Sequence, residues 1–422
     1  MIAQIIPSTL RRFRRSPVTT GLNILALALG FACFISALGV AQYWNMSDSQ
    51  FDKSERTYVL TQKFGIGAGT GHRPLTSPAA AKYMREDFPG LEAVARVANK
   101  REWTVTAESR RAALMGARAD EDLTRIFDFE FVAGDPHRSL DAPDKVVLTE
   151  TAARQLFGDA DPMGQTINFV EDFYPVVSGI IKDIEAPSHF TDVPGSLGHF
   201  EFVYGWPTDL EENDWCLGTT GVTYVLFPES EASVGPDALL QQFPAFLDRR
   251  VPEDQRAAVE FEFGLVKISE LQARVINMAL FGGRTSGLFS VTTLLSFLGI
   301  LVLVVACVNY ANLATAQATS HVKEVGMRKV LGAGRNEIWG QYWFEALVLA
   351  AIAAIASLAL IWLAAPLIAQ VTFIDLRTGL FSSPTPLIVV AIAVCLVSLS
   401  PASTRCSSCP ACARWKPSEP DR

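Results

Sequence analysis

The chain has 422 residues, 49% of them hydrophobic, and its mean hydropathy of +0.23 excludes a purely soluble protein. The formal charge is −8, and the acidic excess is concentrated in residues 45–286, which hold 38 acidic and 23 basic side chains. A segment with a net charge of −15 argues against nucleic-acid binding, which needs a basic face.

Four apolar stretches are candidates for membrane spans. A hydrocarbon core of ~30 Å needs ~20 apolar helical residues, and residues 18–44, 288–314 and 347–369 reach that length. Residues 386–400 stop early, at ~22 Å of helix. The first stretch is too long for a signal-peptide core, and no small-residue cleavage site follows it. We therefore expect an α-helical bundle of three full spans and a truncated fourth.

The bias of Lys and Arg predicts the orientation of these spans. Residues 1–17 form a basic segment with four arginines, and residues 315–342 carry a second basic cluster, so both should be cytoplasmic. Residues 45–286 must then lie outside the cell membrane. The expected location is the cell inner (plasma) membrane, with several spans and a cytoplasmic N-terminus.

The long segment between the first two spans reads as an α+β domain, large enough for its own core and divided into two lobes by the loop-rich residues 188–212. Thr149 should cap a helix over residues 150–157, and Gly158 should close it. Apolar, β-branched or aromatic runs predict strands, and helical spacing predicts two further helices. The strands are expected at residues 58–60, 94–97, 103–106, 146–148, 174–181, 222–227 and 259–268, and the helices at 77–88 and 236–250.

The charged block between the second and third spans can form an amphipathic helix over residues 315–330. Gly332-Ala333-Gly334 would break it before a helix resumes over residues 336–345. If a soluble partner binds a rigid helix between two spans and moves it, both spans move with it. A positive loop that only fixes topology explains the charges equally well, although it needs neither the amphipathic order nor the glycines.

Residues 324–333, EVGMRKVLGA, resemble the EIGIRKVLGAS segment of FtsX-like (MacB-type) ABC-transporter permeases. Each further landmark is modest alone, but together they follow the order of this family from residue 1 to about residue 400. The matching segments are residues 13–17, 21–30, 51–58, 127–129, 134–136, 147–150, 156–158, 161–164 and 179–183.

This resemblance implies a membrane permease that transmits the motion of a separate cytoplasmic ATPase to a MacB-like periplasmic core domain. The implied partners are that ATPase, the bilayer, a second permease half or a second copy, and a periplasmic protein. No cofactor is implied. An alternative function is a non-transporting regulator of a cell-wall hydrolase or a signalling protein. The expected ATPase contacts are Val322, Lys323, Glu324, Gly326, Arg328, Lys329, Gly332 and Ala333.

The tail after Ser400 departs from the family, which continues its fourth span. Residues 401–422 read as neither apolar nor helical, and we interpret them as the product of a shifted reading frame, because permissible codons read two bases later resemble the family's ending. Larger relatives carry a second copy of the spans and external domain, whereas this chain has one copy. Residues 287–400 are the expected FtsX-like permease domain. Cys406, Cys409 and Cys412 are then an accident of codon usage rather than a metal site.

An enzymatic role is not expected. The sequence has no Walker motif, no H-E-x-x-H and no G-x-S-x-G. Its five histidines are scattered, and His189 and His199 could meet acids near Asp192. We expect them instead to be solvated loop residues. ATP hydrolysis should therefore take place on a partner chain.

Overall fold

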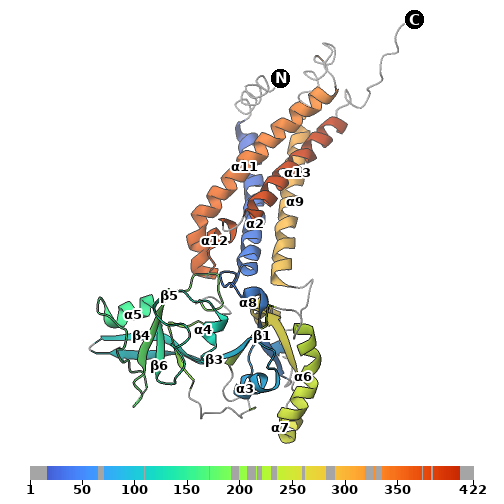
Figure 1. Ribbon diagram of the computed structural model, residues 1–422. Helices are drawn as coiled ribbons and strands as arrows, with labels where there is room; N and C mark the ends of the chain where they lie inside the picture. Colours follow the sequence, from blue (N-terminus) through green and yellow to red (C-terminus); the bar gives the residue numbers. More distant parts are fainter. Residues whose placement is uncertain are drawn as a thin grey trace. The chain divides into compact units, whose positions relative to one another are not determined.

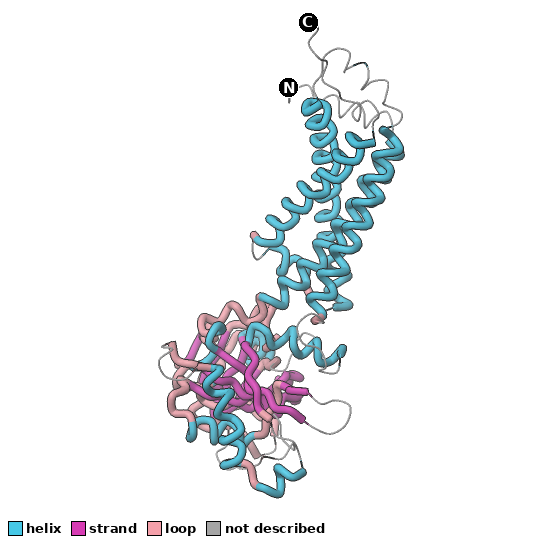
Figure 2. Tube along the Cα trace, turned by 90° about the vertical axis from the view of Figure 1, so that its right-hand side faces the viewer, coloured by secondary structure: helices cyan, strands magenta, loops and turns pink. Residues whose placement is uncertain are grey.

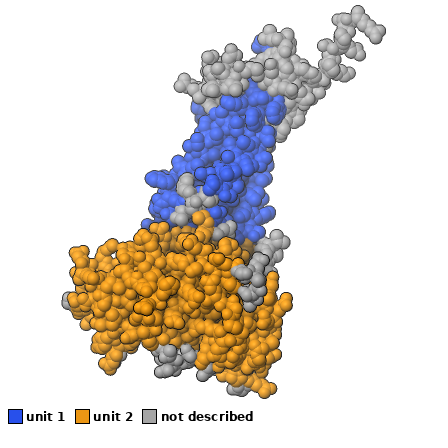
Figure 3. All heavy atoms as spheres, viewed as in Figure 1, with its two compact units in different colours: residues 1–43, 292–422 blue, residues 44–291 orange. Residues whose placement is uncertain are grey.

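The structure is a computed structural model, and its elements fall into two compact units (Figure 3). Unit 1 comprises residues 1–43 and 292–422, and unit 2 comprises residues 44–291. The residues that the structure describes are 17–64, 71–108, 110–170, 172–191, 199–206, 215, 221–229, 235–258, 262–281, 290–318, 327, 335–372, 374–381 and 384–408.

Unit 1 is built from long apolar helices (Figure 1). Within the described residues, three stretches are long and apolar enough to cross a membrane: Pro17–Trp44, Val291–Leu313 and Trp339–Gln370. A shorter apolar stretch, Leu387–Leu399, is the fourth. The helices of this unit are α2 (Pro17–Asn45), α9 (Val291–Ala318), α11 (Arg335–Thr372), α12 (Leu376–Phe381) and α13 (Thr385–Ser408).

The prediction of a helix end at Ser400 is wrong, because α13 continues to Ser408. Residues 401–408 are mostly small and polar, so the helix is extended while its apolar length is not. The apolar part of α13 ends at Leu399 and remains shorter than a full span.

Small residues set the closest approach of α2 and α9. A Cβ placed on Gly30 would lie 2.6 Å from the Cβ of Ala306, and one on Gly299 would lie 2.9 Å from the Cβ of Ala37. Lipid chains are as apolar as the helices, so helix association in a bilayer depends on such close fit rather than on hydrophobic burial.

Unit 2 contains a ten-stranded mixed sheet, which confirms the predicted α+β domain inserted in the chain between the first two spans. Its order is β10-β1-β9-β3-β4-β8-β6-β7-β5, with β2 paired to β1. The β4–β8 and β6–β7 pairs are parallel, and the others are antiparallel. The strands are β1 (Thr57–Phe64), β2 (Gly71–Arg73), β3 (Ala93–Ala107), β4 (Arg110–Ala119), β5 (Phe131–Gly134), β6 (Lys145–Thr149), β7 (Val176–Ile181), β8 (Phe202–Gly205), β9 (Gly221–Leu226) and β10 (Phe263–Lys267).

Strand β3 replaces two predicted short strands. Its first half pairs with β9 from Ala93 to Ala98, and its second half pairs with β4 as far as Ala107. The register shifts between Ala98 and Arg101, so the polar residues that suggested a loop form an irregularity inside one strand.

Helices pack against the sheet in several clusters of buried apolar side chains (Figure 2). The largest of them includes Leu123 of α4 and Leu271 of α8. Beside β9 and β10, Met84 of α3 and Phe246 of α6 are fully buried in one cluster. Beside β6 and β7, Leu156 of α5 packs in another. The shorter and helical elements of this unit are η1 (Ser54–Arg56), α3 (Pro78–Asp87), α4 (Leu123–Ile126), α5 (Glu150–Phe157), α6 (Pro236–Arg250), α7 (Glu253–Ala258) and α8 (Ile268–Phe281).

Local signals located α5 and α6 accurately. Helix α5 spans the predicted residues, and the Thr149 hydroxyl accepts a hydrogen bond from the Ala152 N–H at 3.3 Å. Gly158 follows with φ +65°, in the left-handed region that glycine adopts at low cost. Helix α6 also has its predicted bounds.

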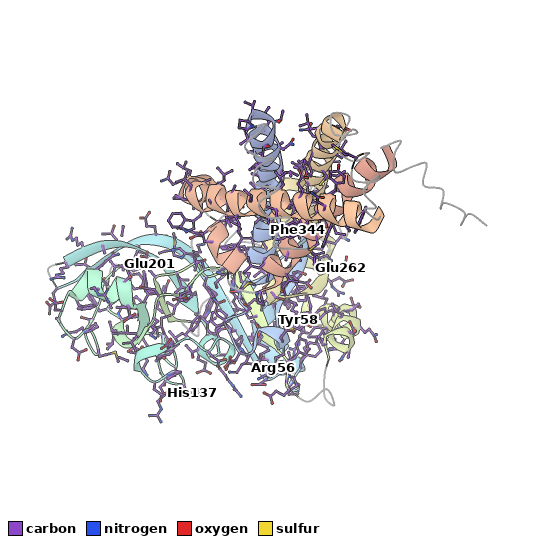
Figure 4. The ribbon with its side chains drawn as sticks, turned by 90° about the horizontal axis from the view of Figure 1, so that it is seen from above. Arg56, Tyr58, His137, Glu201, Glu262 and Phe344 are labelled. Carbon is purple, nitrogen blue, oxygen red and sulfur yellow. The ribbon has the colours of Figure 1, made fainter. Side chains whose placement is uncertain are left out.

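Two central strands were not predicted. β4 is rich in Ala and Arg, which favour strands weakly, and β8 lies inside the stretch expected to be loop. Glu201, labelled in Figure 4, precedes β8, and its carboxylate accepts from the Met115 N–H of β4 at 2.8 Å. Such non-local pairing specifies both strands.

Candidate functional site

The predicted ATPase contacts lie outside the described residues. All eight, Val322, Lys323, Glu324, Gly326, Arg328, Lys329, Gly332 and Ala333, fall between the end of α9 and the start of α11. Within that interval the structure describes Met327, which is helical and 65% exposed. The coupling segment therefore stays a prediction.

The described residues offer a second candidate, a buried polar network directly after α2. Asp48, three residues beyond the helix, has φ +62°, an uncommon conformation that Asp and Asn tolerate best. Its N–H donates to the Pro187 carbonyl at 3.0 Å. The backbone turn at Asp48 is thus tied to the loop that precedes His189.

The Asp48 carboxylate is fully buried and accepts several hydrogen bonds. Ser188 Oγ donates at 2.5 Å and the His189 N–H at 3.2 Å, and Ser47 Oγ lies 3.0 Å from Asp48 Oδ2. Burying a carboxylate is costly unless such donors replace water. We define Ser47, Asp48, Ser188, His189, Tyr224 and Gln272 as the junction network.

His189 connects Asp48 to the centre of the sheet. Its Nδ1 lies 2.9 Å from Asp48 Oδ1, and its Nε2 lies 2.7 Å from the Tyr224 hydroxyl on β9. Burial raises the pKa of the Tyr224 phenol well above its ordinary value, and the charge of Asp48 raises it further. The protonated phenol can therefore donate to Nε2, which leaves the Nδ1 proton facing Asp48.

Gln272 brings α8 into the same network. Its Oε1 lies 2.9 Å from Ser47 Oγ, although the two residues are 225 positions apart in the sequence. Along the chain, Ser47 follows α2, and α8 precedes α9. The segments that lead out of the first span and into the second are thus tied together within unit 2.

Aromatic rings surround the network and keep water out. The Phe127 ring contacts the rings of Phe51, Phe190 and Tyr224, edge to face, with centroids 4.7–5.0 Å apart. Such pairs each contribute ~0.5–1.5 kcal/mol beyond the burial of their area. The low-polarity surroundings strengthen the hydrogen bonds inside and raise the cost of losing any of them.

The Ser, His and Asp of this network are not arranged as a hydrolytic triad. Ser, His and Asp occur together, but Ser188 donates to Asp48 instead of to the imidazole, and His189 is only 1% exposed. A nucleophile must meet its base and its substrate. The network connects the chain segment after α2 to α8 and to strand β9.

The expectation for the histidines is therefore wrong for His189, which is buried and lies beside Asp48. His199 is partly buried, and its Nδ1 lies 3.1 Å from the Phe190 carbonyl. Asp192 lies outside the described residues. No local pattern could pair Asp48 with His189, because the partners are 141 positions apart.

Two family models match this chain. The MacB-like periplasmic core domain matches residues 20–206, and the FtsX-like permease C-terminal region matches residues 296–406. Together they cover more than half of the chain, in the order that the family requires. The chain belongs to the FtsX/MacB-type ABC permeases. The second match extends past Ser400, where we had expected the resemblance to end.

Solved structures give a weaker likeness to this ABC permease. A domain of a putative permease protein from Porphyromonas gingivalis is 17% identical and covers 51% of this chain and 91% of its own, with a TM-score of 0.44. The periplasmic region of MacB from Actinobacillus actinomycetemcomitans is 14% identical (56% and 95% covered, TM-score 0.35). The extracellular domain of the noncanonic ABC-type transporter YknZ from Gram-positive bacteria is 11% identical (50% and 99% covered, TM-score 0.32). Among curated proteins the search found no match.

Membership of this family places the chain among the permease components of ABC systems, whose ATPase activity lies on a separate subunit. The family thereby implies a cytoplasmic ABC ATPase partner and a membrane setting. Its membrane-spanning helices and MacB-like domain fit an inner-membrane protein.

Proposed function

We propose that this permease subunit transmits the ATP-driven motion of its ATPase to the external domain, and that the junction network is the joint through which that motion passes. The observation that carries the proposal is the hydrogen bond from Ser47 to Gln272, which ties the segment after α2 to α8. A force applied to either adjoining span would enter unit 2 at one buried site. The cargo is left open.

The proposed point of entry is the charged block of residues 322–333, with Glu324, Arg328 and Lys329 as polar contacts of the ATPase. When a partner binds an amphipathic segment between two apolar helices and displaces it, both helices can be displaced with it. The proposed topology places this block and the N-terminus in the cytoplasm and residues 45–286 outside, because Lys and Arg accumulate on the cytoplasmic side.

The first experiment tests the docking segment. The double variant Arg328→Glu/Lys329→Glu should lose co-purification with the ATPase and the stimulated ATP turnover, while membrane insertion is kept. The matched control is Arg11→Glu/Arg12→Glu, which reverses as many charges in the other basic segment. Unchanged co-purification and turnover in the first variant would sink the docking assignment.

A second experiment tests the joint itself. Gln272→Ala should preserve docking and ATP turnover but reduce the movement of unit 2, measured as the ATP-dependent change in distance between spin labels in unit 2 and in α11. The matched control is Gln242→Ala at an exposed position of α6, where the amide donates to the Ala238 carbonyl of the same helix at 3.1 Å. If Gln272→Ala showed the same ATP-dependent distance change as the wild-type chain, the junction network would not transmit the proposed motion.

The orientation can be tested by labelling in a Cys216→Ser background, since Cys216 belongs to the external segment. Asp141→Cys should react with a membrane-impermeant thiol reagent in intact spheroplasts, and Asn336→Cys should react only after lysis. The reverse pattern would refute the proposed topology.

A further inference from the structure

Helix α8 packs one of its faces against the core of unit 2. Ile268 and Leu271 are buried in the largest apolar cluster, and Val275 packs against it. Gln272, which bonds to Ser47 in the junction network, is buried as well. These four positions of α8 follow the i, i+3, i+4, i+7 spacing of a single helical face. The link to the segment after α2 therefore belongs to the core face of α8.

Asn277 lies on the opposite side of α8. With 3.6 residues per turn, its position is rotated by about 180° from the middle of the core face. Its Oδ1 accepts a hydrogen bond from the Val291 N–H at 2.7 Å, although the two residues are 14 positions apart in the sequence. Val291 is the first residue of α9, and the first N–H groups of a helix have no acceptor within that helix. A side chain of α8 thus caps the start of α9.

The residue type at position 277 fits this contact. Asn is a weak helix former, because its side chain competes for backbone hydrogen bonds, yet it is a preferred acceptor at helix starts. Asn277 lies inside α8, which runs from Ile268 to Phe281. Helix propensity alone would favour Ala or Leu at this position, but neither could accept a hydrogen bond from α9.

We propose that Asn277 is a positioning residue for α9, and that α8 couples the segment after α2, through Gln272, to the start of the second span, through Asn277. The two links lie on opposite faces of α8, ~7.5 Å apart along its axis. A displacement of α8 would then reach both spans. This deepens the proposed function, on which it rests for the motion, whereas the positioning of Val291 by Asn277 does not depend on that motion.

The first test measures the distance between spin labels at Glu270→Cys on α8 and Leu294→Cys on α9, two exposed positions, in the nucleotide-free full chain. The seven native cysteines are replaced by serine or alanine. We expect Asn277→Ala to broaden the distance distribution at least twofold, because Val291 loses its acceptor. Asn277→Asp keeps an acceptor oxygen and should restore the narrow distribution. The control is Arg274→Ala, at another exposed position of α8, which should leave the distribution unchanged.

Three results of this test would overturn the assignment. A distribution in Asn277→Ala as narrow as in the wild-type chain would mean that the covalent connection positions α9. Equal broadening in Asn277→Ala and Asn277→Asp would mean that the acceptor does not matter. Insertion of Gly-Ser-Gly-Ser after Gly283 lengthens the chain between the two bonded residues. The distance should stay the same after this insertion, and a shifted distance would again assign the positioning to the covalent connection.

The second test adds ATP and the ATPase. The ATP-dependent distance change between labels in unit 2 and in α11 should fall by at least half in Asn277→Ala and recover in Asn277→Asp. An undiminished change in Asn277→Ala would overturn the coupling role of α8. If the wild-type chain showed no ATP-dependent change while Asn277→Ala still broadened the resting distance, the proposed function would fail and the positioning role of Asn277 would stand. The two failures are therefore distinguishable.

Discussion

Different interactions stabilise the interior of each of the two units of this permease. In unit 1, Gly30 of α2 approaches Ala306 of α9 so closely that a Cβ would lie 2.6 Å from its neighbour. In unit 2, the residues just after α2 bury a carboxylate among hydrogen-bond donors and aromatic rings. The chain is thus stabilised by close steric contact at Gly30 and by polar pairing at Asp48, about twenty residues further on.

The difference follows from the two solvents. Helices in lipid gain little from burying apolar surface, so close contact between small residues determines their packing. A water-exposed domain gains a hydrophobic core, which can enclose a polar network and make it specific. Substitutions in unit 1 should therefore reduce stability when they change side-chain volume at a helix contact. Substitutions in unit 2 should reduce stability when they leave a buried polar group without its hydrogen bond.

The largest effect is expected for Asp48→Asn. Asn tolerates the positive φ, so the change removes mainly the charge that faces His189 and Ser188. A hydrogen bond to a charged acceptor contributes ~1.5–3 kcal/mol. We expect a loss near the upper end of that range in urea unfolding of unit 2, followed by tryptophan fluorescence in detergent. Asp159→Asn is the surface control, and an unchanged midpoint in Asp48→Asn would mean that the network adds no stability.

A volume change should dominate in unit 1. Gly30→Leu would overpack the contact with Ala306 and cost ~1–3 kcal/mol. Gly21→Leu lies on the same helix, where an added Cβ meets nothing within 4 Å, and it should be tolerated. The measurement is the thermal stability of the detergent-solubilised chain. Equal losses in both variants would contradict the proposed close contact of α2 and α9.

A smaller effect is expected at the N-cap of α5. Thr149→Ala removes the acceptor for the Ala152 N–H and should cost ~1 kcal/mol. Thr166→Ala, at an exposed position, should change the unfolding free energy by much less. If the two variants cannot be distinguished by urea unfolding, the cap does not stabilise the domain.

The smallest effect depends on pH. The hydrogen bond from Arg250 holds the pKa of Asp87 below its ordinary range, with a further contribution from Arg249, while burial opposes both. Because the folded pKa is lower than the unfolded one, this stabilisation is complete above the unfolded value of ~3.9 and is lost as pH falls through the folded value.

We therefore expect Asp87→Asn to destabilise unit 2 by ~0.5–1 kcal/mol at pH 7, with the difference from wild type shrinking as the pH falls below ~4. Urea unfolding at several pH values measures this. Asp159→Asn should show no such convergence. If the difference in unfolding free energy between Asp87→Asn and wild type increased as the pH fell, the proposed effect of the Asp87 pKa on stability would be contradicted.

The sequence predicted those features whose causes are local. Apolar length located the three spans, and the cap at Thr149 located α5 to the residue. The two halves of β3 were predicted as separate strands, at residues 94–97 and 103–106. Pairing with β9 and β4 holds them in one strand, and that pairing is visible only in the fold.

The junction network belongs to the same non-local class. Asp48 meets His189 and Ser47 meets Gln272 across 141 and 225 positions. No spacing of residues in the sequence predicts either of these groupings. The charged block between α9 and α11 could be recognised because all its residues are contiguous.

Strand β3 also affects the stiffness of unit 2. Because β3 pairs with β9 along one part of its length and with β4 along another, it joins the two sides of one sheet. Bending would concentrate at the irregularity between Ala98 and Arg101, where the ladder is interrupted. If the proposed motion reaches unit 2 at Asp48, the backbone between Ala98 and Arg101 would determine how far the β4 side of the sheet follows the β9 side.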